Sequence, residues 1–227
     1  RVLFRSITTI TVLNLLISLN SLFGQTAKDS LLVFIGERIE VKYSPEEKNE
    51  SPVDTIIEGN DTSYVRQVSI SRDGRFIAKY KILQMIHGSY KTDTIEFFVF
   101  DHYGEPAFSK YQTVMLFVSY NNSLLYHEKY QYFKLYMTEN RKWASPYPTG
   151  DYNHPFKDSI TVKPEKIIFK GEVSFNVEKL TNEERKIRYP KPYYKVKNGH
   201  ATAIYGNYVE ELFKLKQQTI LKARGIY

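Results

Sequence analysis

Residues 111–137 read YQTVMLFVSYNNSLLYHEKYQYFKLYM, and the pattern of this stretch decides the fold class. Two runs rich in aromatic and aliphatic residues, 111–120 and 124–137, flank the tripeptide Asn121-Asn122-Ser123. Aromatic and β-branched residues fit a pleated, half-buried surface, whereas Asn and Ser favour turns. The stretch therefore predicts two antiparallel strands joined by a short turn.

Similar runs precede this pair along the chain. They occupy residues 30–43, 65–71, 75–86 and 94–101. The dipeptide Asp73-Gly74 is a hairpin signal between two of them. Successive strands with short connections predict a mainly β fold, in which an antiparallel meander forms a sandwich or a bent open barrel. The acidic residues 44–63, between the first two runs, are expected to form a surface loop.

The C-terminal third ends in an amphipathic helix pattern. Residues 144–155 hold three Pro and one Gly, which places a possible internal boundary near 144–158. Beyond it come short strand patterns and a capping box that runs from Thr181 to Glu184. Asn207 is the expected cap of the final helix, which should pack on the sheet. The expected apolar stripe consists of Val209, Leu212, Phe213, Ile220 and Leu221.

Composition limits what the chain can be. It has 227 residues, 32 basic and 25 acidic side chains, 19 Tyr, 14 Phe, one Trp and no Cys. The length fits a single β-rich domain over residues 26–227. A chain without Cys has no disulfides, no Cys-ligated metal site and no thiol catalysis. We expect no cofactor, because no nucleotide-binding motif or paired metal-ligand motif is present.

Residues 1–25 have the layout of a secretory signal peptide. Arg1 and Arg5 precede a modestly apolar stretch, with cleavage expected near Gly24 or Ala27. The stretch is short for a membrane span and contains Thr and Asn, so an uncleaved membrane anchor is less favoured than a signal peptide. A buried N-terminal helix is the other alternative. Because the chain begins with Arg, the natural sequence is expected to continue upstream.

The expected location follows from the signal peptide. We expect an extracytoplasmic protein, in the periplasm, at the cell surface or secreted, without a transmembrane span after cleavage. The lack of Cys favours a bacterial source, because eukaryotic secreted domains of this size often carry disulfides. A Gram-negative bacterium is the expected host.

Charge is unevenly distributed along the chain. Residues 141–227 carry 17 basic and nine acidic side chains, whereas residues 26–140 carry 13 basic and 16 acidic ones. A clustered basic surface attracts anionic partners, here a glycan, a lipid headgroup or an envelope protein; a solvated face is the alternative. Nucleic acid is not expected as a partner, because no nucleic-acid-binding motif is present. The densest basic run consists of Arg185, Lys186, Arg188, Lys191, Lys195 and Lys197.

Tyrosines dominate one face of the predicted strand 124–137. A row of Tyr rings forms a platform on which sugar rings or a partner chain can stack, because each ring has a flat apolar face and a polar tip. The alternative is that these rings fill the core of a sandwich. Trp143 is the candidate for one end of the platform. Alternation assigns to this face Tyr126, Tyr130, Tyr132 and Tyr136, interrupted by Glu128 and Lys134.

No catalytic residue is predicted from the sequence. The five His are scattered; His102 and His127 could meet across strands as metal ligands, but turn or surface positions explain them as well. The main expectation is a non-catalytic protein that binds a glycan or a partner protein through its Tyr-rich face. The alternative is a hydrolase of envelope or exogenous polymers with loop carboxylates. A cleft with two facing carboxylates would favour the hydrolase.

Asp-Ser and Asp-Thr pairs are more frequent than the composition predicts. Ser or Thr follows five of the eight Asp residues, where chance gives about one. Four pairs continue with an aliphatic residue, which resembles the Asp-Ser/Thr-aliphatic acceptor sequence of a general O-glycosylation system in some Gram-negative bacteria. Turn preference explains part of the excess. The resemblance implies Thr55 as the first acceptor, in a loop open to a transferase, followed by Ser30, Thr94 and Ser159.

Overall fold

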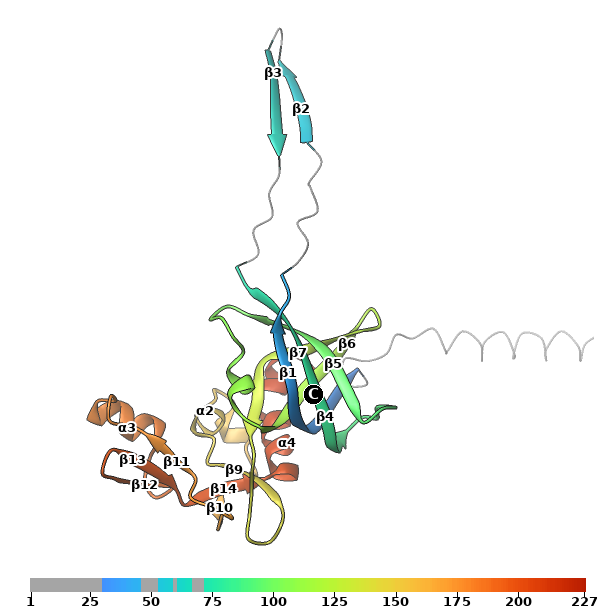
Figure 1. Cartoon of the computed structure of the whole chain (residues 1–227). Coiled ribbons are helices and arrows are strands. Elements are labelled where there is room, and N and C mark those ends of the chain that lie inside the picture. Colours follow the sequence, from blue (N-terminus) through green and yellow to red (C-terminus); the bar gives the residue numbers. More distant parts are fainter. Residues whose placement is uncertain (1–29, 46–52, 59–60, 67–71) are drawn as a thin grey trace, which may run out of the picture.

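The computed structural model describes residues 30–45, 53–58, 61–66 and 72–227. The expected signal peptide and its cleavage region lie outside the described residues. The described residues form a five-stranded barrel, a smaller lobe from the C-terminal third, and a helix that packs on the barrel (Figure 1). No helix among them is long and apolar enough to cross a membrane.

The barrel strands pair in an order that differs from their order in the chain. The order is β1-β4-β5-β7-β6, and β6 closes back onto β1. Pairing is antiparallel, except between β5 and β7. Five strands with this order have the connectivity of an OB-type Greek-key barrel. The strands are β1 (Leu31–Tyr43), β4 (Gly74–His87), β5 (Thr94–Asp101), β6 (Thr113–Asn121) and β7 (Leu124–Lys134).

The predicted mainly β fold with a C-terminal helix on the sheet is confirmed. The barrel closes fully, because the free edge of β7 pairs with β5 instead of facing solvent. Closure removes the unpaired strand edges that an open sheet leaves exposed. The meander is therefore interrupted at the β5 to β6 connection, where the 3₁₀ helix η2 (Ala107–Lys110) places Phe108 in the barrel interior.

Alternate residues of the strands build two hydrophobic layers. Inward-facing side chains such as Phe34, Tyr80 and Phe97 fill the barrel and contact one another edge-on or stacked. Outward-facing side chains of β1, β6 and β7, such as Ile35 and Phe117, are covered by the C-terminal helix. The barrel is thus packed on both sides of β1 and β6, which explains their nearly continuous apolar sequence.

The C-terminal helix has two segments, α4 (Val209–Gln218) and α5 (Ile220–Ala223). Of the expected stripe, Val209, Leu212 and Leu221 are buried, whereas Phe213 and Ile220 are half-buried and pack against the same cluster. The expected cap is wrong: the helix is capped at Tyr208, and Asn207 lies inside a strand. There the fully buried Asn207 amide is held by several hydrogen bonds, which outweigh a capping role.

The smaller lobe consists of two small sheets and short helices. One sheet has the order β10-β14-β9-β8 and the other the order β11-β13-β12. The capping box predicted at Thr181 and Glu184 is present at the start of α3. The elements are β8 (Tyr136–Met137), β9 (Trp143–Pro146), α2 (Thr149–Tyr152), η3 (Lys157–Ser159), β10 (Glu165–Lys166), β11 (Ser174–Asn176), α3 (Asn182–Arg188), β12 (Tyr194–Lys197), β13 (His200–Ala203) and β14 (Tyr205–Tyr208).

The loop expected over residues 44–63 contains regular structure. β2 (Val53–Glu58) and β3 (Asp61–Arg66) form an antiparallel hairpin. The acidic and Pro-rich composition suggested a loop, but Val, Thr and Ile dominate residues 53–57 and favour a strand. The Gly59-Asn60 dipeptide between the two runs is itself a hairpin turn signal. The hairpin predicted at Asp73-Gly74 is wrong, because β3 pairs with β2, and β4 pairs with β1 and β5.

Candidate functional site

A cleft of about 610 Å³ lies between the barrel and the smaller lobe. Cavities of this size hold small ligands in many proteins. The barrel wall of the cleft contributes Tyr111, Tyr130, Tyr132 and Lys134, and the opposite wall contributes Tyr147, Asp151, Arg188, Tyr189 and Tyr194. Lys216 of α4 lies at the junction of the two walls. Residues far apart in the sequence therefore converge on an aromatic and basic cavity.

A distortion of β7 directs its tyrosines into the cleft. Tyr130 has a φ of 66°, in the left-handed region that non-Gly residues rarely adopt. The neighbouring His127 ring is buried in the barrel, and its Nε2 atom lies 2.9 Å from the Gln131 carbonyl oxygen. This contact spans the distorted turn of the strand. After this turn, the side chains of β7 that face into and out of the barrel exchange places. Tyr130 and Tyr132 line the cleft.

Lys134 is the cleft cation with the most aromatic surroundings. Its ammonium lies 3.5 Å from the centre of the Phe175 ring and 5.8 Å from that of Tyr111. Among the described residues no carboxylate forms an ion pair with it. Burial lowers the pKa of Lys134 to about 8, because the charged form loses hydration that no counter-charge replaces.

Three tyrosines line the cleft together with Lys134, and the rings of two of them, Tyr111 and Tyr132, lie 6.2 Å apart between centres. Burial raises the pKa of Tyr132 to about 12, with smaller contributions from Tyr111 and the Asp101 carboxylate. The pKa values of Tyr111 and Tyr189 are also raised, mainly by burial, and Tyr111 contributes to the shift of Tyr189. These hydroxyls therefore stay protonated near neutral pH and can donate hydrogen bonds to a ligand.

The remaining cations of the cleft have partners. Lys216 is buried, its Nζ lies 2.5 Å from an Asp151 oxygen, and it donates to the Gln131 side chain at 2.9 Å. Arg188 lies 3.7 Å from the Glu184 carboxylate one helical turn away. The buried Lys216–Asp151 ion pair, with its hydrogen bond to Gln131 of β7, joins the lobe to the barrel.

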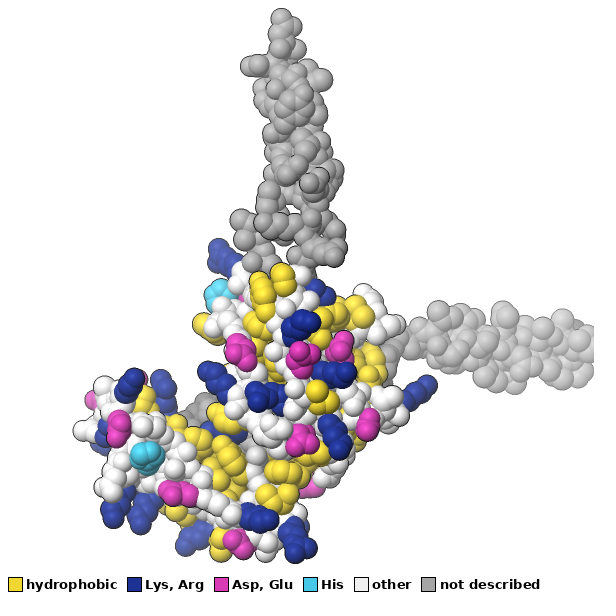
Figure 2. Space-filling view, in the orientation of Figure 1, with side chains coloured by type: hydrophobic (Ala, Val, Ile, Leu, Met, Phe, Trp, Pro, Cys, Tyr) yellow, Lys and Arg dark blue, Asp and Glu magenta, His cyan; other side chains and the backbone are white. Residues whose placement is uncertain are grey.

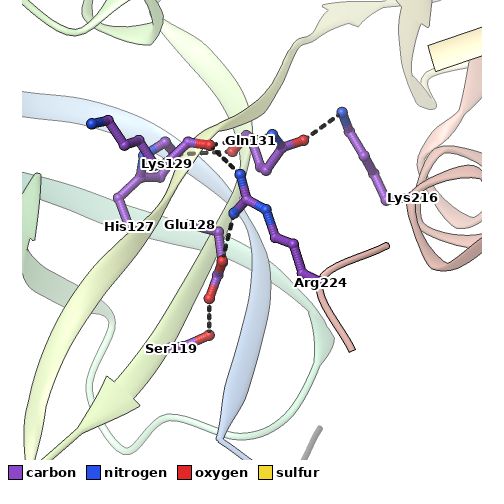
Figure 3. A network of polar contacts seen from close by, with 7 residues as sticks. All are labelled: Ser119, His127, Glu128, Lys129, Gln131, Lys216 and Arg224. Atoms are coloured by element: carbon purple, nitrogen blue, oxygen red, sulfur yellow. Dashed lines mark hydrogen bonds and ion pairs between the residues drawn. The ribbon is translucent and has the colours of Figure 1, made fainter. Parts of the chain in front are cut away.

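Polar contacts fix the helical end of the chain to β7 beside the cleft (Figure 3). The Arg224 guanidinium lies 2.7 Å from the Glu128 carboxylate and donates to the Lys129 carbonyl at 2.7 Å. Glu128 in turn accepts a hydrogen bond from the Ser119 hydroxyl at 2.6 Å. Lys216 and Arg224 thus hold the same strand from α4 and from the segment after α5 (Figure 3). The C-terminal helical region therefore supports the strand β7, which forms one wall of the cleft.

Further tyrosines pack behind Tyr147 and Tyr194 of the lobe wall. The Tyr147 ring stacks on Tyr193 at 3.7 Å and on Tyr152 at 4.8 Å between ring centres. The Tyr194 hydroxyl donates to the Tyr147 carbonyl at 2.8 Å, and the Tyr152 hydroxyl donates to Asn207. These contacts tie the rings of the lobe wall to one another and to the backbone.

The tyrosines of the predicted platform do not share one flat face. Tyr126 packs against Phe98 and Phe100 on the outer surface of the barrel. Tyr130 and Tyr132 line the cleft, and Tyr136 contacts Phe169 in the lobe. Trp143 is half-buried in the layer beneath α4. The strand distortion at Tyr130 separates them, and their role in binding stays a prediction.

The predicted basic run is spread over α3, β12 and the segment between them. Arg185 is committed to structure, because its guanidinium donates to the Val177 and Glu178 carbonyls. Arg188 lines the cleft and is itself exposed, as are the others of the set, Lys186, Lys191, Lys195 and Lys197. Figure 2 shows Lys and Arg along the margins of this lobe, with Asp, Glu and His among them. The run is therefore no single-sign patch, and its partner stays a prediction.

The proposed acceptor hydroxyls differ in their surroundings. Ser159 is exposed at the end of η3, and Ser30 is half-buried just before β1. Thr94 is half-buried, and its hydroxyl lies 3.2 Å from an Asp93 carboxylate oxygen. Thr55 belongs to β2 rather than to an irregular loop, and its side chain lies outside the description. Glycosylation of these residues stays a prediction.

The two histidines considered as metal ligands do not meet. His127 is buried in the barrel, where burial lowers its pKa to about 4, whereas His102 is largely exposed and lies 3.4 Å from Asp73. Among the described residues no group of three His, Cys, Asp or Glu side chains is arranged to hold a metal ion.

Sequence reasoning missed most of the lobe wall and Lys134. Tyr111, Tyr147 and Tyr189 come from separate elements, and no spacing pattern links them. Lys134 was visible only as an interruption of an aromatic face, although a lysine among aromatic residues is a signal for a desolvated cation. Comparison of the chain with known protein families, curated proteins and solved structures finds no match.

Proposed function

We propose that this chain is an exported, non-catalytic protein that binds a glycan in the cleft between the barrel and the smaller lobe. The observation that carries the proposal is the convergence of tyrosines from both walls on one cavity of about 610 Å³. A short saccharide segment presents flat apolar ring faces edged by hydroxyls. Tyr rings complement both features, since each combines an apolar face with a polar tip.

The shape of the site favours a glycan over a folded protein partner. The tyrosines line a concavity rather than a flat surface, and the lobe wall is braced by ring stacking and buried hydrogen bonds. A preformed cavity reduces the ordering cost of binding a small ligand. A protein partner is expected instead to use a broader face.

The acids of the cleft support binding rather than hydrolysis. A glycosidase needs two carboxyl groups that flank the scissile bond. Among the described residues that line the cleft, Asp151 is the one carboxylate, and its oxygen lies 2.5 Å from the Lys216 ammonium. Export is supported by the sequence of residues 1–25.

A binding experiment with matched tyrosine variants tests this function. The mature protein is screened on an array of bacterial envelope glycans, and binders are measured by calorimetry. Tyr130→Ala removes an exposed ring of the cleft, whereas the control Tyr43→Ala removes an exposed ring that is not part of the cleft. We expect loss of binding with the first variant only. Absence of any glycan binder, or an equal loss of glycan affinity in both variants, would contradict the proposal. Capture of a protein without any glycan would favour the hypothesis of a partner protein.

A further inference from the structure

Lys134 gives the cleft a positive charge that the described residues do not balance. Lys216 lies against Asp151 and Arg188 lies near Glu184, whereas Lys134 has only aromatic rings as close partners. A partly buried ammonium without a counter-ion is unfavourable, because it has lost water and gained no opposite charge. An anion that enters the cleft would supply that charge.

Donors for such an anion stand around Lys134. No hydrogen bond within the described residues uses the hydroxyls of Tyr111, Tyr132 and Tyr189, although Tyr194 and Tyr152 in the same region do donate to partners. The Tyr111 and Tyr132 rings lie 6.2 Å apart between centres, and Tyr189 stacks at 5.7 Å on Phe175, the ring that lies under the Lys134 ammonium. Protonated phenols and an ammonium are all donors, which suits the several lone pairs of an oxyanion.

One negative group lies near these donors and does not occupy them. The Asp101 carboxylate is buried and contributes to the raised pKa of Tyr132. Its Oδ1 atom accepts a hydrogen bond from the Tyr103 backbone N–H at 2.8 Å. Asp101 is thus held at the end of β5, and the three phenols and Lys134 remain open to the cleft.

We propose that Lys134, with the hydroxyls of Tyr111, Tyr132 and Tyr189, forms an oxyanion site, and that the glycan bound in the cleft carries an acidic group at this point. This inference rests on the proposed function, and it narrows the ligand to an acidic saccharide. The acidic group is a carboxylate, as in a uronic acid, or a phosphate on a sugar. Both have the same need for convergent donors and a cation.

Paired acidic and neutral ligands test the oxyanion site. The probes are an oligogalacturonate, the same oligosaccharide as its methyl ester, and a sugar phosphate with its unphosphorylated sugar. Calorimetry is performed on the wild type, on Lys134→Met, and on Tyr132→Phe with Tyr120→Phe as control, because Tyr120 is a half-buried tyrosine that is not part of the cleft. We expect an acidic probe to bind at least about tenfold more tightly than its neutral counterpart. Lys134→Met and Tyr132→Phe should reduce that preference, and the control should keep it.

A second measurement on the wild type covers the case in which Lys134→Met fails to fold. The pKa of Lys134 is followed by NMR of labelled lysine side chains with and without the bound acidic probe. We expect the pKa to rise from about 8 on binding, because an adjacent anion favours the ammonium.

The outcomes separate the two proposals. Equal binding of acidic and neutral probes, with an unchanged Lys134 pKa, would overturn the oxyanion site and leave glycan binding intact. Binding of neither class of probe, together with the absence of any binder on the glycan array, would overturn both proposals. A preference for one acidic probe identifies carboxylate or phosphate as the source of the charge. Acid-selective binding that Lys134→Met and Tyr132→Phe do not alter would place the anion elsewhere and contradict the assignment.

Discussion

Lys134 makes the stability of the protein depend on pH in the alkaline range. Its pKa is about 8 in the folded protein, below the ordinary value of 10.5. Between these two values the unfolded chain binds more protons than the folded one, so stability rises with pH across this interval. Lys134→Met removes this rise. Denaturant unfolding of both proteins gives the free energy of unfolding as a function of pH. The difference in favour of Lys134→Met should be largest below pH about 8 and should shrink above it. Parallel curves would contradict the burial of the ammonium.

His127 acts in the acid range. Burial lowers its pKa from 6.5 to about 4, so the folded barrel holds a neutral ring. The stability that this ring contributes is complete above pH 6.5 and is lost as the pH falls toward 4, because the unfolded chain takes up the proton first. We expect His127→Gln to lose less stability than the wild type over this interval, while the exposed-site control His200→Gln follows the wild type. Identical profiles for all three proteins would show that His127 titrates normally.

Single residues show how far the sequence could predict the site. The tyrosine content of residues 124–137 pointed to an aromatic surface, and Tyr130 and Tyr132 do line the cleft. Alternation alone placed them on a common face with Tyr126, because a strand is assumed to be regular. The left-handed backbone at Tyr130 separates them, and no local sequence signal marks that position for distortion.

At the scale of elements, packing of α4 on the barrel should carry a large part of the stability. Leu212 is fully buried between the helix and the outer face of the barrel. Truncation of a buried Leu leaves a cavity and costs about 2–5 kcal/mol. Leu212→Ala should therefore lower the melting temperature clearly, whereas Glu210→Ala, at an exposed position of the same helix, should not. An unchanged melting temperature for Leu212→Ala would show that the helix does not stabilise the barrel.

Elements with strong local signals were predictable, and those that depend on distant partners were not. Periodicity identified the strands of the barrel and the C-terminal helix, and the capping box identified α3. The cap at Asn207 failed because tertiary hydrogen bonds hold that amide inside β14. The pairing of β5 with β7 joins segments separated by a whole strand, and no pattern within either segment encodes it.

At the scale of the molecule, the cleft exists because the lobe folds back against the barrel. The Lys216–Asp151 ion pair, which also contacts Gln131 of β7, joins the two parts at the base of the cleft. The site therefore could not be read from either half of the chain alone. Sequence composition did indicate the basic character of the C-terminal third, which supplies Arg188 to the cleft.

Binding of an acidic glycan should weaken with added salt. Exposed charges on the lobe are screened within about 8–10 Å at moderate ionic strength. Arg188→Glu should weaken binding more than Lys195→Glu, because Arg188 lines the cleft and Lys195 is exposed elsewhere on the lobe. Calorimetry at low and high salt checks this prediction. Salt-independent affinity, or equal effects of the two charge reversals, would contradict an electrostatic contribution at the cleft.

NMR mapping of tyrosine ring signals tests the location of the binding site most directly. The protein is labelled at its Tyr rings and titrated with the acidic oligosaccharide that binds in calorimetry. Rings that line the cleft should shift, namely Tyr111, Tyr130, Tyr132 and Tyr189. Rings away from it, such as Tyr43, Tyr90 and Tyr120, should keep their positions. Shifts confined to the second group, or to Tyr126 on the outer barrel surface, would contradict a binding site in the cleft.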